Sequence, residues 1–276
     1  MTQWSNYQKA IFREIAKGTG HIIVDAYAGS GKTTTLVKAM DFIPSHHKVL
    51  LTAFNKHIKK ELRQRVKHAH VKVSTFHSLG LAAVTRRFGT VEIKENKVFE
   101  IVKDLLPTSQ KKNYDFIKTV DDAVNWCKKG IDDTPTAIRR IIHEQDLDLQ
   151  DYTEEDFIKL VIATLVKCKE QTNVIDYMDM CWFCFVYDLD VGKFDIVGVD
   201  EFPDVSKLLL VMALSALKTN GRLFFFGDPF QTIYKWLGAD STIVSKLRSD
   251  PRTVQLPLPI SYRCPKKVIY LAQKIV

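Results

Sequence analysis

The chain has 276 residues, 46% of them hydrophobic, which is enough for one large domain or two ordinary ones of roughly 150 residues each. Lys and Arg total 40 against 32 Asp and Glu, and the net charge of +8 favours polyanionic partners, nucleic acid first among them, with a merely basic protein as the alternative. The odd number of cysteines, five, and an N-terminal segment without an apolar core argue against a secreted protein. No stretch reaches the roughly 18 consecutive apolar residues of a membrane span. We therefore expect a reduced, cytoplasmic protein with no membrane partner, in the host cytoplasm if the chain is viral, and leave a nuclear location open.

Residues 1–90 alternate between short apolar runs and helical patterns. Strand patterns at 21–25 and 48–53 are followed by helix patterns at 33–40 and 56–66. Such alternation predicts a parallel sheet whose strands are joined by crossover helices.

The middle of the chain follows a different pattern. From 91 to 190 the sequence is charged and helix-periodic, with breaks at Pro107, Gly130 and Pro135, which indicates a helical insertion. After this insertion, the pattern predicts strands at 194–199 and 222–226. A last helix is predicted to begin at Pro265.

Cys181 and Cys184 form a CxxC inside this middle region. An apolar run surrounds the two cysteines, and no second pair stands at the spacing of a zinc site. We therefore interpret them as buried thiols on a core helix rather than as a metal or redox site.

Residues 26–33 read Ala-Tyr-Ala-Gly-Ser-Gly-Lys-Thr and fit the P-loop pattern, except that Ala26 stands where the strict form has Gly. A predicted strand precedes the loop and a helix follows, so loop amides and the helix N-terminus can face phosphates together. The glycines allow close backbone approach, the lysine supplies a cation, and the threonine hydroxyl can ligate Mg²⁺, whereas a purely structural turn is the alternative. The predicted nucleotide contacts are Ala28, Gly29, Ser30, Gly31, Lys32, Thr33 and Thr34, and Thr33 is also a predicted metal ligand.

An acidic pair, Asp200 and Glu201, directly follows the apolar strand pattern at 194–199. Asp200 is predicted to hold Mg²⁺, and Glu201 to accept a proton from an attacking water. Solvated loop charges are the alternative for two adjacent acids, but the P-loop upstream favours the catalytic interpretation.

Gln231 follows the next strand pattern. Loops after strand ends are where α/β sheets place ligands, so its amide could respond to the terminal phosphate, and an ordinary polar turn is the alternative.

Taken in order, these segments resemble the UvrD/Rep/PcrA-like branch of superfamily 1 DNA helicases, and the residues of the motifs are somewhat closer to those of its phage-type members. The resemblance implies a P-loop NTPase with a RecA-like parallel sheet, called domain 1A, and a helical insertion, called domain 1B. The segment at 6–10 looks like the Q motif, whose glutamine, here Gln8, reads the adenine edge and implies ATP over GTP. The segment at 261–263 looks like motif IV, where Tyr262 would pack on adenine and Arg263 would act as a finger on the terminal phosphate. The catalytic residues so implied are Lys32, Glu201, Gln231 and Arg263, with ATP and Mg²⁺ as cofactors.

The same resemblance implies a single-strand DNA track. The segments at 52–56, 74–78 and 227–239 look like motifs Ia, Ib and III, and the partners implied are single-stranded DNA and duplex junctions. Aromatic faces and a cationic path are suited to binding single-stranded DNA without sequence preference. For an isolated aromatic residue, packing in the core is the alternative. The predicted DNA-binding residues are Phe54, Asn55, Lys56, Thr75, His77, Tyr234 and Trp236. The basic segment at 56–67 is interpreted as half solvated helix face and half phosphate contact, with Glu61 pairing Arg65 one turn on.

Two positions depart from the family pattern. Pro203 stands where a Gln is usual and offers neither a side-chain amide nor a backbone N–H, and Leu237 replaces a usual Arg. These departures leave open a nucleotide-dependent DNA-binding or regulatory module with little turnover. A small-molecule P-loop kinase is a weaker alternative, because it does not explain the motif III and motif IV segments.

The resemblance also implies a layout for the chain. We expect residues 1–90 and 191–264 to form domain 1A, 91–190 to form domain 1B, and 265–276 to open domain 2A. The rest of the second RecA-like domain would come in cis or from a partner chain, so the sequence is interpreted as the N-terminal motor half of a 3′ to 5′ helicase, either a fragment or a naturally short protein. A missing arginine finger can cost roughly 10³ to 10⁵ in rate, so we expect feeble hydrolysis by this chain alone.

Overall fold

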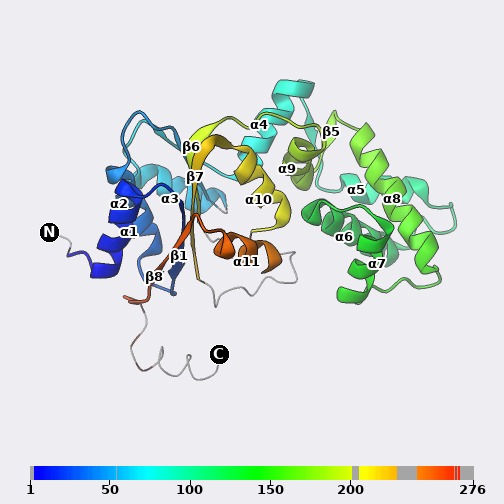
Figure 1. Ribbon diagram of the computed structural model, residues 1–276. Coiled ribbons are helices and arrows are strands. Elements are labelled where there is room, and N and C mark those ends of the chain that lie inside the picture. Colours follow the sequence, from blue (N-terminus) through cyan, green and yellow to red (C-terminus); the bar gives the residue numbers. More distant parts are fainter. Residues whose placement is uncertain are drawn as a thin grey trace.

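The computed structural model describes residues 3–53, 55–200, 205–228, 241–263, 265 and 267, with only the backbone described for 241–244. At its centre is a six-stranded parallel sheet with the strand order β3-β2-β6-β7-β1-β8 (Figure 1). The strands are β1 (His21–Ala26), β2 (Val49–Thr52), β3 (Val71–Ser74), β6 (Phe194–Asp200), β7 (Leu217–Gly227) and β8 (Thr253–Leu258). The predicted α/β class with a RecA-like parallel sheet is confirmed.

Helices cover both faces of the sheet, which explains why its central strands are apolar almost throughout. All four residues of β2 are buried, and so are six of the seven in β6. One face packs against α1 (Asn6–Lys17), α2 (Lys32–Ala39), η1 (Met40–Phe42) and α3 (Lys56–Arg65). The other face packs against α4 (Phe76–Phe88), α10 (Lys207–Ser215) and α11 (Ser241–Ser249), and Figure 1 shows α10 and α11 on that side.

The region between α4 and β6 is mainly helical. It contains β4 (Glu92–Ile93), α5 (Lys97–Leu105), α6 (Tyr114–Gly130), α7 (Pro135–Glu144), α8 (Glu154–Glu170), β5 (Val174–Ile175) and α9 (Tyr177–Val186). Its core is continuous with the α4 and α10 face of the sheet. Of the helices that the structure describes, none combines the length and the apolar character that a bilayer crossing needs.

The two CxxC cysteines lie on α9, as predicted. Cys181 and Cys184 are both buried and free, and burial raises the pKa of the Cys184 thiol to about 12. Within the described residues no cluster of His, Cys, Asp and Glu could hold a metal ion. The burial of both thiols on α9 confirms that they are buried thiols on a helix.

A buried ionic cluster holds this helical region together. Lys128 of α6 is fully buried and donates to Asp179 Oδ1 at 2.7 Å and to Asp176 Oδ2 at 2.9 Å, both at the start of α9. Lys97 of α5 donates to the other oxygen of Asp179 at 2.7 Å and to two carbonyls at the end of α8. An unpaired buried charge costs several kcal/mol, so each cation fixes its helix against Asp179, the carboxylate that both lysines share. Hydrophobic periodicity gave no sign of this cluster.

Several elements of the sheet domain were not recognised from the sequence, among them the helices α4, α10 and α11. The helix α1 was considered only for its Q motif, and β3 has only four residues, of which Lys72 and Ser74 are polar. The strand β8 lies at the sheet edge and includes Gln255 and Pro257, which resemble a loop more than a strand. Proline is tolerated in an edge strand because one side of such a strand needs no ladder donor. The helix predicted from Pro265 lies almost entirely outside the described residues.

Asp121 on α6 is a partly buried acid with a raised pKa. Burial, with a further contribution from Asp122, raises the pKa of its carboxyl to about 6, while Asn125 donates to it at 3.0 Å. The folded protein therefore holds this proton more tightly than the unfolded chain does. For a raised carboxyl pKa, the contribution to stability is full below the unfolded value and is lost as pH rises through the folded one.

We predict that Asp121→Asn increases the free energy of unfolding at pH 8 by on the order of 1 kcal/mol, because the buried charge is removed. The loss of stability of the wild-type protein between about pH 4 and 6 should shrink in the variant. Urea unfolding across that range measures both effects. Asp104→Asn, which removes an exposed carboxylate from α5, serves as the control. Equal pH dependence in all three proteins would contradict the assignment.

Candidate functional site

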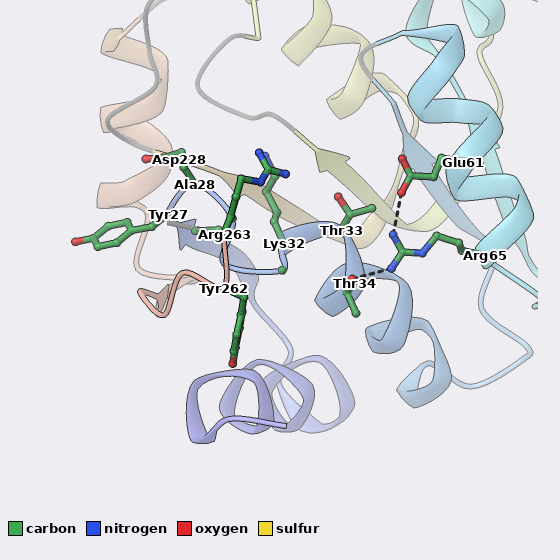
Figure 2. Close-up of a pocket in the computed structure, with 13 residues that line it drawn as sticks. Tyr27, Ala28, Lys32, Thr33, Thr34, Glu61, Arg65, Asp228, Tyr262 and Arg263 are labelled. Carbon is green, nitrogen blue, oxygen red and sulfur yellow. Dashed lines mark hydrogen bonds and ion pairs between the residues drawn. The ribbon is translucent and has the colours of Figure 1, made fainter. Parts of the chain in front are cut away.

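A cavity of about 450 Å³ opens at the carboxyl edge of the sheet (Figure 2). Parallel sheets bring the loops after all their strands to this one edge, which is why segments distant in sequence meet there. The cavity is lined by Ala26, Tyr27, Ala28, Gly29, Gly31, Lys32, Thr33, Thr34, Glu61, Arg65, Asp228, Tyr262 and Arg263. Eight of these belong to the predicted P-loop and the turn of α2 that follows it.

The P-loop runs from the end of β1 to the start of α2. Gly31 is the N-cap of α2 with a φ of 80°, and in the described residues no side chain caps this helix, so its first-turn amides can face an anion. Gly29 also has a positive φ, 71°, and a Cβ there would lie 2.4 Å from Cβ of Arg263. Glycine is therefore required at position 29 by both conformation and space.

Lys32 and Asp200 meet across this edge of the sheet. Lys32 begins α2 and Asp200 ends β6, and Lys32 Nζ lies 3.5 Å from Asp200 Oδ1. The Asp200 side chain is 2% exposed and that of Lys32 is 15% exposed, so the pair lies inside the cavity wall rather than on the surface. The sequence predicts that these two side chains converge, and the structure brings them together.

The segment after β8 holds the P-loop from the other side. Tyr262 N donates to the carbonyl of Gly29 at 2.8 Å, and Ser261 Oγ donates to the carbonyl of Ala28 at 2.7 Å. Arg263 thereby reaches the cavity that Lys32 also lines (Figure 2). The Tyr262 ring, 64% exposed, also lines the cavity.

Gln8 has a structural role next to the same loop. It completes the capping box of α1 with Ser5, and its Nε2 donates to Thr35 Oγ1 at 2.9 Å, which donates in turn to the carbonyl of Gly31. A Cβ on Gly31 would lie 3.9 Å from Gln8 Nε2 and 4.0 Å from Cδ2 of Tyr262, so both side chains flank this glycine. Gln8 and Tyr262, the two predicted adenine contacts, therefore lie next to the same glycine of the loop.

Arg65 is a cavity residue that sequence reasoning missed. Its NH2 donates to Thr34 Oγ1 at 2.7 Å and its NH1 donates to Glu61 Oε1 at 3.0 Å, as Figure 2 shows. The predicted Glu61 and Arg65 pair is thus confirmed, but it lies at the phosphate loop instead of on a plain solvated face. No local signal identifies this contact, because it depends on how α3 packs against α2.

The predicted DNA-binding segments begin α3 and α4. Asn55 caps α3 by accepting from Ile58 N at 2.9 Å, and Lys56 is exposed beside it. Thr75 caps α4 by accepting from Ser78 N at 3.1 Å and is only 4% exposed, which argues against a direct DNA contact by its side chain. His77 is half-buried, and burial lowers the pKa of its imidazole.

Lys59 links the first turns of α3 and α4 through a hydrogen bond. Its Nζ donates to Ser78 Oγ at 3.0 Å. Burial lowers the pKa of this amine first, and the remaining causes are the nearby cations Arg63, Lys56 and Lys72. Cations gathered this closely favour a polyanion that would neutralise them.

Several predicted site residues lie outside the described residues. They are Phe54, Glu201, Gln231, Tyr234 and Trp236, together with the two departures, Pro203 and Leu237.

Comparisons with known proteins agree with the resemblance seen in the sequence. The family model of the UvrD/REP helicase N-terminal domain matches residues 6–252. The chain is 26% identical to a probable DNA helicase II homolog of Mycoplasma pneumoniae, across 100% of this chain and 42% of that protein. It is 23% identical to the ATP-dependent DNA helicase PcrA of Staphylococcus epidermidis, across 93% of this chain and 38% of that protein, and 23% identical to the PcrA of Staphylococcus aureus, across 98% and 40%. The chain thus spans about two fifths of the length of these curated relatives.

We predict that Gly29→Ala weakens binding of a nucleoside triphosphate at least about tenfold, because the new Cβ pushes the loop away from Arg263. Gly89→Ala is the matched control, since Gly89 has a φ of 82° but nothing within 4 Å of the added Cβ. Both variants place a Cβ on a residue with a positive φ and should each lose roughly 1 to 3 kcal/mol of stability, so affinity is compared only between folded samples. A fluorescent ATP analogue measures binding, and equal affinities in the two variants would contradict the steric argument.

Proposed function

The chain belongs to the UvrD/REP helicase N-terminal domain family, and from that premise we propose that it is the ATP-binding motor part of a DNA helicase. The proposed whole protein hydrolyses ATP, moves along single-stranded DNA in the 3′ to 5′ direction and separates duplex at junctions. The observation that carries the proposal is the distance of 3.5 Å between Lys32 Nζ of the P-loop and Asp200 Oδ1 at the end of β6. Proposed partners are DNA and a second RecA-like domain, in the same protein or in another chain.

The cavity has the chemistry of a magnesium-triphosphate site. Lys32, Arg65 and Arg263 supply cations around the uncapped start of α2. Between the cavity-lining Gly29 and Gly31, Ser30 Oγ is buried and makes no hydrogen bond within the described residues. Thr33 and Asp200 are the proposed Mg²⁺ ligands, and this ion supplies charge neutralisation for the phosphates when bound.

The remaining catalytic roles are proposed from motif positions. Glu201 directly follows Asp200 and would accept the proton of the attacking water, while Gln231 would orient that water or respond to the terminal phosphate. Arg263 would stabilise negative charge on the terminal phosphate from its position beside the loop. Gln8 and Tyr262, which flank Gly31, would bind adenine by hydrogen bonds and stacking.

The DNA surface is proposed to lie over the starts of α3 and α4. The cations around Lys59 would contact phosphates, and Asn55, Lys56 and His77 would contact the strand nearby. Phe54, Tyr234 and Trp236 would supply faces on which bases stack, each stack being worth about 1 to 3 kcal/mol. Such contacts predict affinity with little sequence preference.

A second candidate is a DNA-binding regulatory module that binds ATP with little turnover. Pro203 favours it, since this residue follows the acidic motif at a position where the family uses a Gln for coupling. The two candidates differ in turnover and not in binding.

Hydrolysis of ATP separates these candidates. In a chain extended through the second RecA-like domain, we expect single-stranded DNA to stimulate ATP hydrolysis, and Lys32→Ala and Glu201→Gln to abolish that stimulation. Lys32→Ala should also weaken ATP binding at least about tenfold, whereas Lys38→Ala, an exposed lysine of the same helix paired with Asp41, should leave binding unchanged. Tight binding of ATP and DNA with no turnover in the extended chain would favour the regulatory module. Binding of neither would contradict both.

The salt dependence of DNA binding tests the proposed surface. Replacing Lys56 and Lys59 by Ala should reduce the slope of log affinity against log salt by about 1 for each phosphate that the variant no longer neutralises. Replacing Lys9 and Lys17 of α1 by Ala removes the same charge and should leave the slope unchanged. Fluorescence anisotropy of labelled oligo(dT) measures the slope, and equal slopes in both double variants would contradict the placement.

A further inference from the structure

A second cavity, of about 560 Å³, lies at the amino edge of the sheet, opposite the edge that carries the P-loop. It is larger than the nucleotide cavity and falls within the range of about 300 to 1,000 Å³ that is typical of small-molecule sites. Residues from the starts of several strands line it, among them His21 of β1, His47 before β2, Asp195 of β6, Arg222 of β7 and Arg252 before β8. Charged and polar side chains therefore meet at this edge of the sheet as well.

Arg222 is a half-buried cation in the lining of this cavity. Its Nε donates to the carbonyl of Gly20 at 2.8 Å, its NH1 to that of Ile15 at 3.0 Å and its NH2 to that of Glu14 at 3.1 Å. All three acceptors are neutral, and within the described residues no carboxylate forms an ion pair with this guanidinium. Because a guanidinium has five N–H groups, these bonds fix its position and still leave one N–H on NH1 and one on NH2.

The charge of Arg222 is only partly compensated inside the protein. Burial lowers the pKa of the guanidinium, and the attraction of Glu14 offsets this effect in part. Asp195, the acid of the cavity lining, is already paired with Lys218 Nζ at 2.8 Å and accepts from the backbone N–H of Lys48 at 2.8 Å. A half-buried cation without a counter-ion is stabilised by an anion that can reach it.

His21 and Arg252 supply further donors to the same cavity. The backbone N–H of Leu223 donates to His21 Nδ1 at 3.1 Å, so a neutral His21 has its ring proton on Nε2. Burial lowers the pKa of this imidazole, which keeps it neutral at pH 7. Arg252, with 73% of its side chain exposed, pairs with Asp250 through Nε and NH2, which leaves its NH1 group for another acceptor. A set made up mainly of N–H donors is suited to an oxyanion.

Apolar side chains form another part of the lining. Ile15 of α1, Ile43 after η1 and Ile196 of β6 all line the cavity. An inorganic ion would leave these side chains and most of the volume without contacts, whereas a ligand with an apolar group would cover them.

We propose that this cavity binds a small organic oxyanion, a phosphate or a carboxylate carried on an apolar group. Arg222 and His21 bind the charged group, and the isoleucines contact the apolar group. The inference is independent of the proposed function, because this cavity and the nucleotide cavity share no lining residue.

Four probe molecules test the proposal: phenyl phosphate, benzoate, benzyl alcohol and inorganic phosphate. Backbone amide NMR signals show where each probe binds, since Gly20 and Gly221 lie at this cavity and Gly29 and Gly31 at the P-loop. We expect phenyl phosphate or benzoate to shift the signals of Gly20 and Gly221. The tighter of the two should bind at least about tenfold more tightly than benzyl alcohol, which has no charge, and than inorganic phosphate, which has no ring. Their relative affinities identify the ligand as a phosphate or a carboxylate.

Two kinds of variant locate the site. Arg222→Met should weaken binding of the anion at least about tenfold and leave the affinity for benzyl alcohol unchanged. Because this variant also loses the bonds to the end of α1, Ala16→Phe provides a second test. Ala16 is exposed on α1 and lines the cavity, so the added ring fills part of it and should weaken binding at least about tenfold. Ala82→Phe is the matched control, since Ala82 is exposed on α4 outside this lining, and it should leave the affinity unchanged.

Several results would overturn the inference. One is the absence of any shift at Gly20 and Gly221 with either anion up to about 10 mM. Another is benzyl alcohol binding as tightly as the anions, and a third is an affinity that Ala16→Phe leaves unchanged. Shifts confined to Gly29 and Gly31 would place the anion at the P-loop, which overturns this inference and leaves the proposed function standing.

Discussion

The contact between Lys32 and Asp200 is the interaction on which the site depends. The two residues belong to different crossover units and meet only because parallel strands deliver their following loops to one edge of the sheet. A lysine placed against a nearly buried carboxylate forms a cation and anion pair of the kind that Mg²⁺ and phosphate can enter. The six-stranded sheet therefore holds these two charges 3.5 Å apart.

The phosphate loop itself is held from outside. The loop itself contributes two glycines in the left-handed region and a helix start without a side-chain cap. These features suit an anion, but they do little to hold the loop in one conformation. Rigidity comes from the segment after β8, which bonds to the carbonyls of Ala28 and Gly29, and from Arg248, which binds the strand just before the loop. The proposed nucleotide site is thus completed by residues more than two hundred positions away from the motif that identifies it.

Local pattern was enough to predict the loop, the parallel sheet and the convergence of Lys32 with Asp200. These features depend on spacing and on strand direction, which a sequence displays. The edge strand β8 was missed because Pro257 and Gln255 break the strand pattern where one ladder side is free. Arg65 and Arg248 were missed because their contacts depend on helix packing, and Lys128 because a buried lysine looks like a surface one until its carboxylates are in place.

The most direct measurement is the effect of Mg²⁺ on ATP affinity in the wild-type chain, in Lys32→Ala, in Asp200→Asn and in the double variant. If both side chains surround one magnesium-triphosphate, Mg²⁺ should strengthen ATP binding in the wild type and have almost no effect in Asp200→Asn, and the two substitutions should be strongly non-additive. An unchanged Mg²⁺ effect in Asp200→Asn, with additive effects in the double variant, would contradict the account.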